Sequence, residues 1–484
     1  MPGSPSSIHA RGALRAAITA TAARLAPGSG VPTARHLALI AESEPLLPPV
    51  EWTDPAALAL ATQFSARARH DALSLGTTLI DRYFDGARLR RPATLSAGVR
   101  SQLYSSVAEY CCALGWTRVG AHFGAEAQLF ADTDALRYRA LTVRALAQSM
   151  NAEFREAAAD IHRADELFAA AGWAAPERAF AHVLAEIIVN SARGDAERLR
   201  QLGRELTSAQ PDDPFWSFTA VSADVLARTF DRDFAGAFAL SSELLYGSRR
   251  QSSHRAVRFF LTCIRADMLV ARGEHEEALA TMSTHDDSDG HGFCVATQRA
   301  VSLLHLGRER DVIVETDACA ANEADHNLRT LAPLLARRAV ALRRLGQTSK
   351  AVRSMESVIL LTNRVGESVL PFRMLPHGEV CALLEAVAAE RPELHDAIEE
   401  IRAVLPKVTI AAPEAAPPSA ATVLTSSERS LAEMLSTSRT LGDIARARGV
   451  SVNTVKSQAR SIYLKLGVRG RAEVARHLVG RPLT

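Results

Sequence analysis

The 484-residue chain has few aromatic residues and almost none of the patterns that β-strands require. Phe, Trp and Tyr together make up 5% of the residues. No alternating run of Val, Ile, Thr or Tyr is bounded by tight-turn dipeptides, so strands are not expected. Long amphipathic segments dominate instead, and 47% of the residues are hydrophobic. The sequence therefore predicts an all-α fold, and its length predicts about two to four domains.

The motifs that mark common catalytic and nucleotide-dependent sites are also missing. The dipeptide Gly-Lys never occurs, which excludes a phosphate-binding loop of the form GxxxxGK[ST]. The alternating strands and helices of a phospho-acceptor receiver domain are absent. No nucleophile stands near a base and an orienting group. We therefore expect neither enzymatic activity nor a cofactor.

The six cysteines include no Cys-x-x-Cys pair, so we interpret them as buried free thiols in a reducing cytoplasm. Residues 285–294 are crowded with metal-ligand types. An EF-hand loop starting at His285 would place Ala296 where a bidentate glutamate is required. A zinc site would need His285, His291, Cys294 and a further ligand. A solvated loop is the simpler interpretation, and no metal site is predicted.

Acidic residues are absent from the first forty positions, which hold four arginines. A transit peptide shares this composition, but the arginines interrupt any secretory apolar core. We interpret residues 1–40 as a disordered start followed by one amphipathic helix. No run approaches 18 apolar residues, so no membrane span and a cytoplasmic location are predicted.

Three segments of residues 41–405 repeat one pattern around Gly273, Gly307 and Gly346. In each, an alanine precedes the glycine by seven positions, and a small or branched residue follows it by five. Small residues let paired helices approach closely, and glycine suits the end of the first helix. The pattern resembles tetratricopeptide repeats, with weaker copies around Asn151, Gly194 and Asp231; a plain bundle of unrelated helices is the alternative. Such repeats expose a concave surface suited to an effector or a protein partner.

Residues 406–423 are rich in Ala and Pro and have no helical periodicity, which predicts a linker. The segment after it, residues 424–484, holds eleven Lys and Arg against four Asp and Glu. Its net charge is therefore +7, whereas the rest of the chain carries −5. A basic terminal domain on a slightly acidic body favours binding to phosphate groups.

One run of this basic segment, residues 451–468, separates into two faces when laid on a helix of 3.6 residues per turn. The apolar face carries Val455, Ala459, Ile462 and Leu466. The opposite face carries Asn453, Lys456, Ser457 and Arg460. Hydrogen-bonding and cationic side chains suit base edges and phosphates. The run therefore predicts a helix that packs on its own domain and presents a reading surface to DNA.

The preceding residues predict the rest of a helix-turn-helix. Thr440 with Asp443 three positions later predicts a capped short helix. Gly449 can adopt the left-handed conformation that ends it, and Ser451 can cap the next helix. Residues 425–428 form a capping box for an earlier helix, and residues 470–478 predict a fourth.

These motifs resemble the LuxR-type helix-turn-helix domain of bacterial transcription regulators. The matching residues are Leu424, Thr425, Glu428, Ile444, Ala445, Val450, Ser451, Asn453, Thr454, Val455, Lys456, Ile462, Tyr463, Lys465, Leu466, Gly467, Arg471 and Ala472. The resemblance implies a four-helix domain over residues 424–484 that binds double-stranded DNA as a homodimer, with RNA polymerase as the eventual partner. It implies base contacts from Lys456, Ser457 and Arg460, and backbone contacts from Asn453 and Thr454. Lys465, in the same helix, completes the expected DNA-binding set. The implied core consists of Ile444, Ala445, Val450, Val455, Ala459, Ile462 and Leu466.

Four positions depart from the family pattern. Ser427 replaces a usual arginine, and Ser438 and Arg439 replace a glycine and an apolar residue. Gly442 lies inside the predicted short helix, at a cost of up to ~1 kcal/mol relative to alanine. These positions leave open an alternative function, a repeat-based protein-interaction adaptor with a degenerate helix-turn-helix. The sequence favours a transcription regulator whose repeat region senses an effector or docks a protein.

Overall fold

The computed structural model describes residues 5–48, 53–247, 253–283, 292–322, 326–366, 368–410, 424, 426–466, 470–471 and 473–474. Within these residues the secondary structure is almost entirely helical, with α-helices labelled up to α23. The exceptions are short 3-10 turns, an isolated bridge, and the two-residue strands β1 (Phe84–Asp85) and β2 (Arg88–Leu89), which pair antiparallel. The predicted all-α fold is confirmed.

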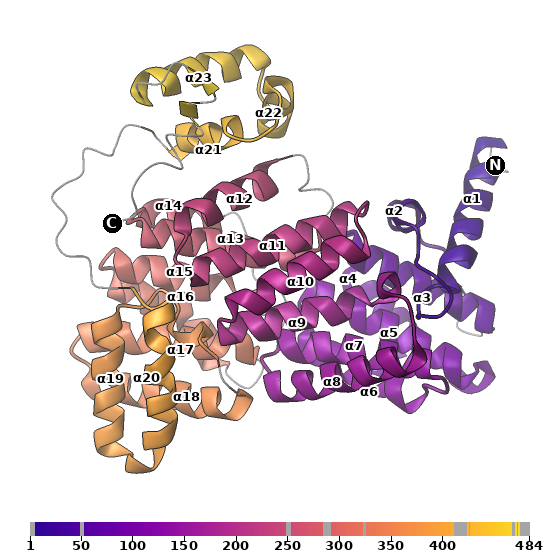
Figure 1. Cartoon of the computed structure of the whole chain (residues 1–484), viewed down its shortest axis with the longest axis horizontal. Helices are drawn as coiled ribbons and strands as arrows, with labels where there is room; N and C mark the ends of the chain where they lie inside the picture. Colours follow the sequence, from indigo (N-terminus) through magenta and orange to yellow (C-terminus); the bar gives the residue numbers. More distant parts are fainter. Residues whose placement is uncertain are drawn as a thin grey trace.

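Most of the body consists of eight helix pairs stacked along the chain (Figure 1). The pairs are α5 (Ala97–Leu114) with α6 (Thr117–Leu129), α7 (Asp134–Met150) with α8 (Phe154–Ala171), α9 (Phe180–Arg193) with α10 (Ala196–Ala209), α11 (Pro214–Phe230) with α12 (Phe234–Tyr246), α13 (Arg255–Ala271) with α14 (His275–Met282), α15 (Val295–His305) with α16 (Glu309–Ala321), α17 (Leu328–Arg344) with α18 (Thr348–Val365), and α19 (His377–Glu390) with α20 (His395–Val408). The first helix of each pair also contacts the first helix of the next pair. These first helices therefore form an inner layer, and the second helices form an outer one.

In each of the first seven pairs, the two helices are joined by the same type of turn. Each first helix is followed by a residue with a left-handed backbone, in order Gly115, Ala152, Gly194, Arg232, Gly273, Gly307 and Gly346. The next backbone N–H then donates to the carbonyl five residues earlier, at 2.8–3.0 Å in all seven turns. This bond satisfies a carbonyl that the helix end would otherwise leave without a partner. The expected helix ends at Gly273, Gly307 and Gly346 are confirmed, while membership of the tetratricopeptide family stays a prediction.

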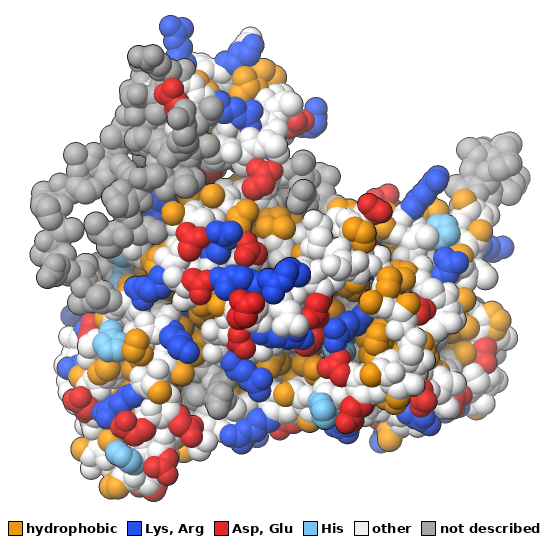
Figure 2. All heavy atoms as spheres, viewed as in Figure 1, with side chains coloured by type: hydrophobic (Ala, Val, Ile, Leu, Met, Phe, Trp, Pro, Cys, Tyr) orange, Lys and Arg blue, Asp and Glu red, His pale blue; other side chains and the backbone are white. Residues whose placement is uncertain are grey.

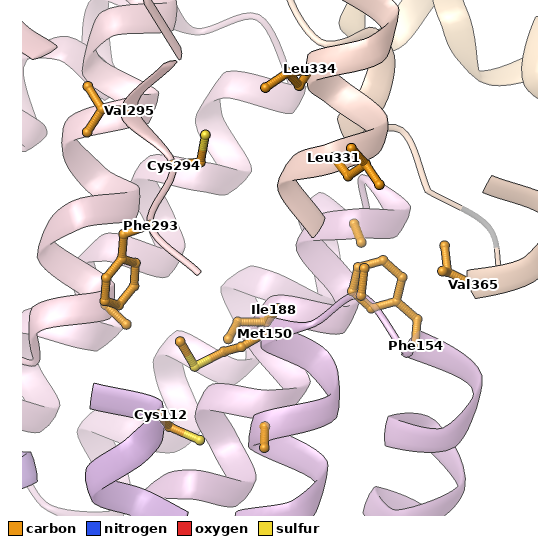
Figure 3. Packing of buried hydrophobic residues seen from close by; sticks show 14 of the residues in the cluster. Cys112, Met150, Phe154, Ile188, Phe293, Cys294, Val295, Leu331, Leu334 and Val365 are labelled. Atoms are coloured by element: carbon orange, nitrogen blue, oxygen red, sulfur yellow. The ribbon is translucent and has the colours of Figure 1, made fainter. Parts of the chain in front are cut away.

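The inner layer encloses the main hydrophobic core. Buried residues from almost every pair belong to a single cluster. Figure 3 shows Met150 and Ile188 extending into the same interior as Leu331 and Leu334, which come from a later part of the chain. Because α13 also contacts α5, the stack of pairs curls back on itself. Among the described residues, no helix is both long and apolar enough to cross a bilayer.

The prediction for residues 1–40 differs from the structure. Residues from Pro5 onward form α1 (Pro5–Ala22), and a second helix, α2 (Ala34–Glu42), runs through the predicted boundary at residue 40. Leu14 and Ile18 of α1 pack with Leu37 and Ile40 of α2. Further helices α3 (Asp54–Arg69) and α4 (Gly76–Tyr83) lead into the first pair. The prediction allowed for one helix in this region and so missed α2, whose short apolar stripe consists of Leu37, Ile40 and Ala41.

The predicted linker also starts too early. Helix α20 continues through Pro406 to Val408, which is buried. Beyond it, the Ile410 N–H donates to the Leu375 carbonyl at 3.1 Å, and its carbonyl accepts from the His377 N–H at 2.9 Å. Residues 406–410 therefore belong to the body, and residues 411–423 lie outside the described residues.

The C-terminal domain contains α21 (Ser426–Leu435), α22 (Leu441–Arg448) and α23 (Val452–Leu466). Of the fourth predicted helix, residues 470, 471, 473 and 474 are described. Val474 is buried there with Leu431 and Leu435 of α21. In Figure 1 the domain lies beside α12 and α14, with α21 facing the body and α23 on the far side.

Candidate nucleic-acid interface

The turn between α22 and α23 is fixed by local hydrogen bonds. The Thr440 hydroxyl accepts from the Asp443 N–H and the Asp443 carboxylate accepts from the Thr440 N–H, both at 3.2 Å, a reciprocal cap at the start of α22. The Thr440 hydroxyl also donates to the Asp443 carboxylate at 2.6 Å, and this bond together with the one from the Thr440 N–H holds the pKa of Asp443 below its ordinary value. Gly449 is left-handed, with φ of +65°, and the Val450 N–H donates to the Ala445 carbonyl. The Ser451 hydroxyl then caps α23 by accepting from the Thr454 N–H at 3.1 Å. The predicted caps and turn are confirmed.

The polar face of α23 is open to solvent in the full chain. The exposed side chains are Asn453, Thr454, Lys456, Ser457 and Arg460. Among the described residues, no carboxylate lies within ion-pair distance of Lys456 or Arg460. The backbone N–H groups of the first turn of α23 lie beside Asn453 and Thr454, where a helix end favours an anion. The arrangement thus brings free cations and a positive helix end to one surface.

The apolar face of α23 closes the domain core. Ile444, Ala445, Val455, Ala459 and Ile462 are all buried in a single cluster.

Val450 differs from the prediction, because its side chain is 38% exposed. It follows the left-handed Gly449, which turns the chain outward, and its backbone rather than its side chain serves the motif. Lys465 and Leu466 belong to the last turn of α23, but their side chains lie outside the described residues.

A model of the family described as "Bacterial regulatory proteins, luxR family" matches residues 422–478. The match covers α21, α22 and α23 and the whole of the exposed polar face. This is a LuxR-family helix-turn-helix domain. The domain supports a role for the chain in DNA-binding transcription regulation. None of the curated proteins matches the chain.

Charge on the rest of the molecule contrasts with this domain. Figure 2 shows blue and red side chains intermixed over the central helices of the body; on the small domain at the top, blue side chains project outward and a few red ones also appear. Many of the body's arginines form ion pairs, for example Arg178 with Asp165 at 2.5 Å and Arg198 with Glu186 at 2.5 Å. Lys456 and Arg460, which have no ion-pair partner in the part of the chain that the structure describes, are therefore more available to a polyanion than the paired arginines of the body.

Sequence reasoning missed a buried ion pair that joins the two parts of the chain. Arg265 of α13 forms a salt bridge with Glu433 of α21, and their side chains are 1% and 4% exposed. The Arg265 guanidinium also lies 4.1 Å from the ring centre of Phe238 and donates to the Ser242 hydroxyl at 2.9 Å. Burial raises the pKa of Glu433, and the Arg265 charge opposes that shift.

Three further contacts surround this pair. Arg429 of α21 lies 2.8 Å from Glu274, in a pair whose side chains are 20% and 16% exposed. The Ser438 hydroxyl donates to Glu243 at 2.8 Å, and Arg439 donates to the Gly247 carbonyl at 3.1 Å. We call these contacts and the Arg265–Glu433 pair the domain junction. It involves α21 and the turn after it, so the polar face of α23 stays free.

Two groups of metal-ligand side chains occur among the described residues. Cys294, Cys319 and His326 are buried together, with the two sulfur atoms 4.0 Å apart. Structural zinc sites use four protein ligands, and this group supplies three. The second group, Asp165, His182 and Glu186, is already compensated by Arg178 and Arg198. The predicted loop at residues 285–291 lies outside the described residues.

Proposed function

We propose that the chain is a sequence-specific transcription regulator that reads a paired site in duplex DNA as a dimer. In this proposal Lys456, Ser457 and Arg460 of α23 contact base edges in the major groove. Asn453 and Thr454 contact the phosphate backbone at the start of the helix, and Lys465 adds a cation further along. RNA polymerase is the eventual partner, and the protein acts in the cytoplasm, where bacterial DNA lies.

The observation that carries this proposal is the free polar face of α23 on a domain of the LuxR family. Lysine and arginine can form two hydrogen bonds to guanine, and serine bonds to either kind of base. The spacing of Lys456, Ser457 and Arg460 puts them on one side of the helix, within one turn of each other. A helix of this width fits the major groove.

The test is a mobility-shift titration of the full chain on promoter fragments at fixed salt. Lys456→Ala and Arg460→Ala should each weaken specific binding by ~1–3 kcal/mol if the side chain reads a base. Arg446→Ala is the matched control, because it removes one charge from the same domain on a side chain that is 83% exposed on α22. The control should weaken specific and non-specific binding by the same factor. Unchanged specific affinity in both α23 variants would refute their assignment.

For the body we propose a sensing role, in which an effector or a protein partner binds the concave side of the inner helix layer. The alternative function, an adaptor with a degenerate helix-turn-helix, drew on Ser427, Ser438, Arg439 and Gly442. Two of these residues have partners inside the chain: Ser438 donates to Glu243, and Arg439 donates to the Gly247 carbonyl. Their departure from the family pattern therefore does not require loss of DNA binding.

A further inference from the structure

A cavity lies on the inner face of the curved helix stack. Its volume is about 130 Å³, and it is lined by α9, α11, α13, α15 and α17, all of them first helices of their pairs. Ile187, Leu226 and Phe260 form part of its largely apolar wall. A cavity of about 150 Å³ in another protein accommodates benzene. The space therefore suits a ligand the size of a substituted ring or a short acyl chain.

The cavity wall holds more positively charged side chains than negatively charged ones. Arg329, Arg337 and Arg373 line it together with a single carboxylate, Asp267. Asp267 is 3% exposed and already has two partners. One oxygen pairs with Arg373, and the other accepts from the Gln298 amide at 2.6 Å.

The other two guanidinium groups have no such partner. Arg337 is 3% exposed and donates to backbone carbonyls, at 2.8 Å to Pro333 and at 3.3 Å to Pro371. Arg329 lies over the Phe260 ring, with its guanidinium carbon 4.0 Å from the ring centre. Among the described residues, neither arginine has a carboxylate within ion-pair distance.

Burial lowers the pKa of Arg329 and of Arg337 to about 10. Both groups therefore stay protonated at neutral pH, and three cations against one anion leave a net charge of +2 on the wall. A buried charge without a counter-charge is costly. An anion that enters the cavity removes that cost and forms charge-assisted hydrogen bonds, which a neutral ligand of the same shape does not.

We propose that this cavity binds a small organic anion, a carboxylate on an apolar body. The carboxylate lies against Arg329 and Arg337, whose planar donor groups match its geometry. The apolar body lies against α9 and α11, where Ile187 and Leu226 line the wall. This inference names the ligand class for the proposed sensing role, and the site itself does not depend on DNA binding.

The test uses two pairs of shape-matched probes with the full-length protein and no DNA. Benzoate is compared with benzamide, and hexanoate with hexanamide, by isothermal titration. If one charge-assisted interaction forms, we expect at least one of the two carboxylates to bind about tenfold or more tightly than its amide. Equal affinity within both pairs, or no binding by either carboxylate at millimolar concentration, would overturn the proposal. Inorganic phosphate is run in parallel, and phosphate binding as tight as the better carboxylate would also overturn it.

Substitutions test whether Arg329 is the cation that binds the carboxylate. Arg329→Met should weaken binding of the preferred carboxylate about tenfold or more and leave its amide unchanged. Arg329→Lys, which keeps the charge but loses the planar donor group, should retain part of the preference. Unchanged amide binding by Arg329→Met shows that this variant has not simply misfolded. Arg343→Met, at an exposed arginine of the same helix α17, should change neither probe. A loss of affinity that is equal for carboxylate and amide would contradict an electrostatic role for Arg329. Mobility-shift assays without ligand test DNA binding separately. A failure of the ligand proposal can therefore be distinguished from a failure of the proposed DNA-binding function.

Discussion

Glu433→Gln should release the C-terminal domain from the body. The substitution keeps the shape of the side chain and removes its charge, which leaves the Arg265 guanidinium buried at 1% exposure without a counter-ion. Removing one partner of a buried pair costs about 3–5 kcal/mol. At 1.4 kcal/mol per tenfold, this cost shifts the equilibrium between docked and undocked domains by roughly 10²–10³·⁵.

The remaining contacts of the domain junction involve side chains that are less buried. The Arg429 guanidinium lies 2.8 Å from Glu274 and 3.7 Å from Glu277, and these side chains are 16–20% exposed. Arg429→Gln is therefore the comparison variant and should shift the docking equilibrium less than Glu433→Gln does. The solvent can hydrate Arg265 once the domain has moved away, so undocking is expected in place of unfolding.

Hydrogen exchange and small-angle scattering measure this outcome. In Glu433→Gln, amides of α12 and α21 should lose protection, and the radius of gyration should rise, while the inner helices of the body stay protected. The double variant Arg265→Met with Glu433→Leu should dock again, because apolar side chains can replace a buried ion pair at little cost. Unchanged exchange and scattering in Glu433→Gln would refute the argument that the buried pair holds the junction.

Four other substitutions test local features. Gly273→Ala should lower the free energy of unfolding, measured by chemical denaturation, by about 1–2 kcal/mol, because Gly273 has φ of +74° and a side chain is strained there. Ala152→Gly, at the equivalent turn with φ of +65°, should raise the free energy of unfolding by up to about 1 kcal/mol. Gly442→Ala should slow hydrogen exchange in α22, because alanine favours the helix by up to ~1 kcal/mol and the nearest atom to its Cβ would be 3.7 Å away. Burial lowers the pKa of His254 from 6.5 to about 4, so stability should be lost as the pH falls from 6.5 towards 4, by about 2 kcal/mol between pH 7 and pH 5. His254→Asn keeps an acceptor at the start of α13 and should remove that part of the pH dependence; an unaltered pH profile would contradict it.

Local sequence signals were sufficient to predict much of the fold and helix α23. The caps at Thr440 and Ser451 and the turn at Gly449 depend on residues within a few positions of each other. The helix ends at Gly273, Gly307 and Gly346 follow from one residue type. At the equivalent turns Ala152 and Arg232 take the same left-handed backbone. Residues with a side chain rarely adopt it, so residue preference does not predict it there.

Features that depend on distant contacts could not be predicted. In the sequence, Arg429 and Glu433 lie four residues apart, the spacing of an ordinary solvated pair on a helix surface. The burial of Glu433 and the partial burial of Arg429 follow from the approach of α13 and α14 to α21. The cavity arginines pose the same difficulty, because Arg337 and Asp267 come from helices that meet after several pairs have stacked.

The departures from the family pattern show how one part of a chain constrains another. Taken alone, Ser438 and Arg439 weaken a helix-turn-helix, since a glycine and an apolar residue would suit the turn after α21. In the full chain the Ser438 hydroxyl and the Arg439 guanidinium bind Glu243 and the Gly247 carbonyl at the end of α12. A glycine and an apolar side chain could not form those bonds. The substitutions are therefore explained by the domain junction, and this junction leaves the polar face of α23 exposed for DNA.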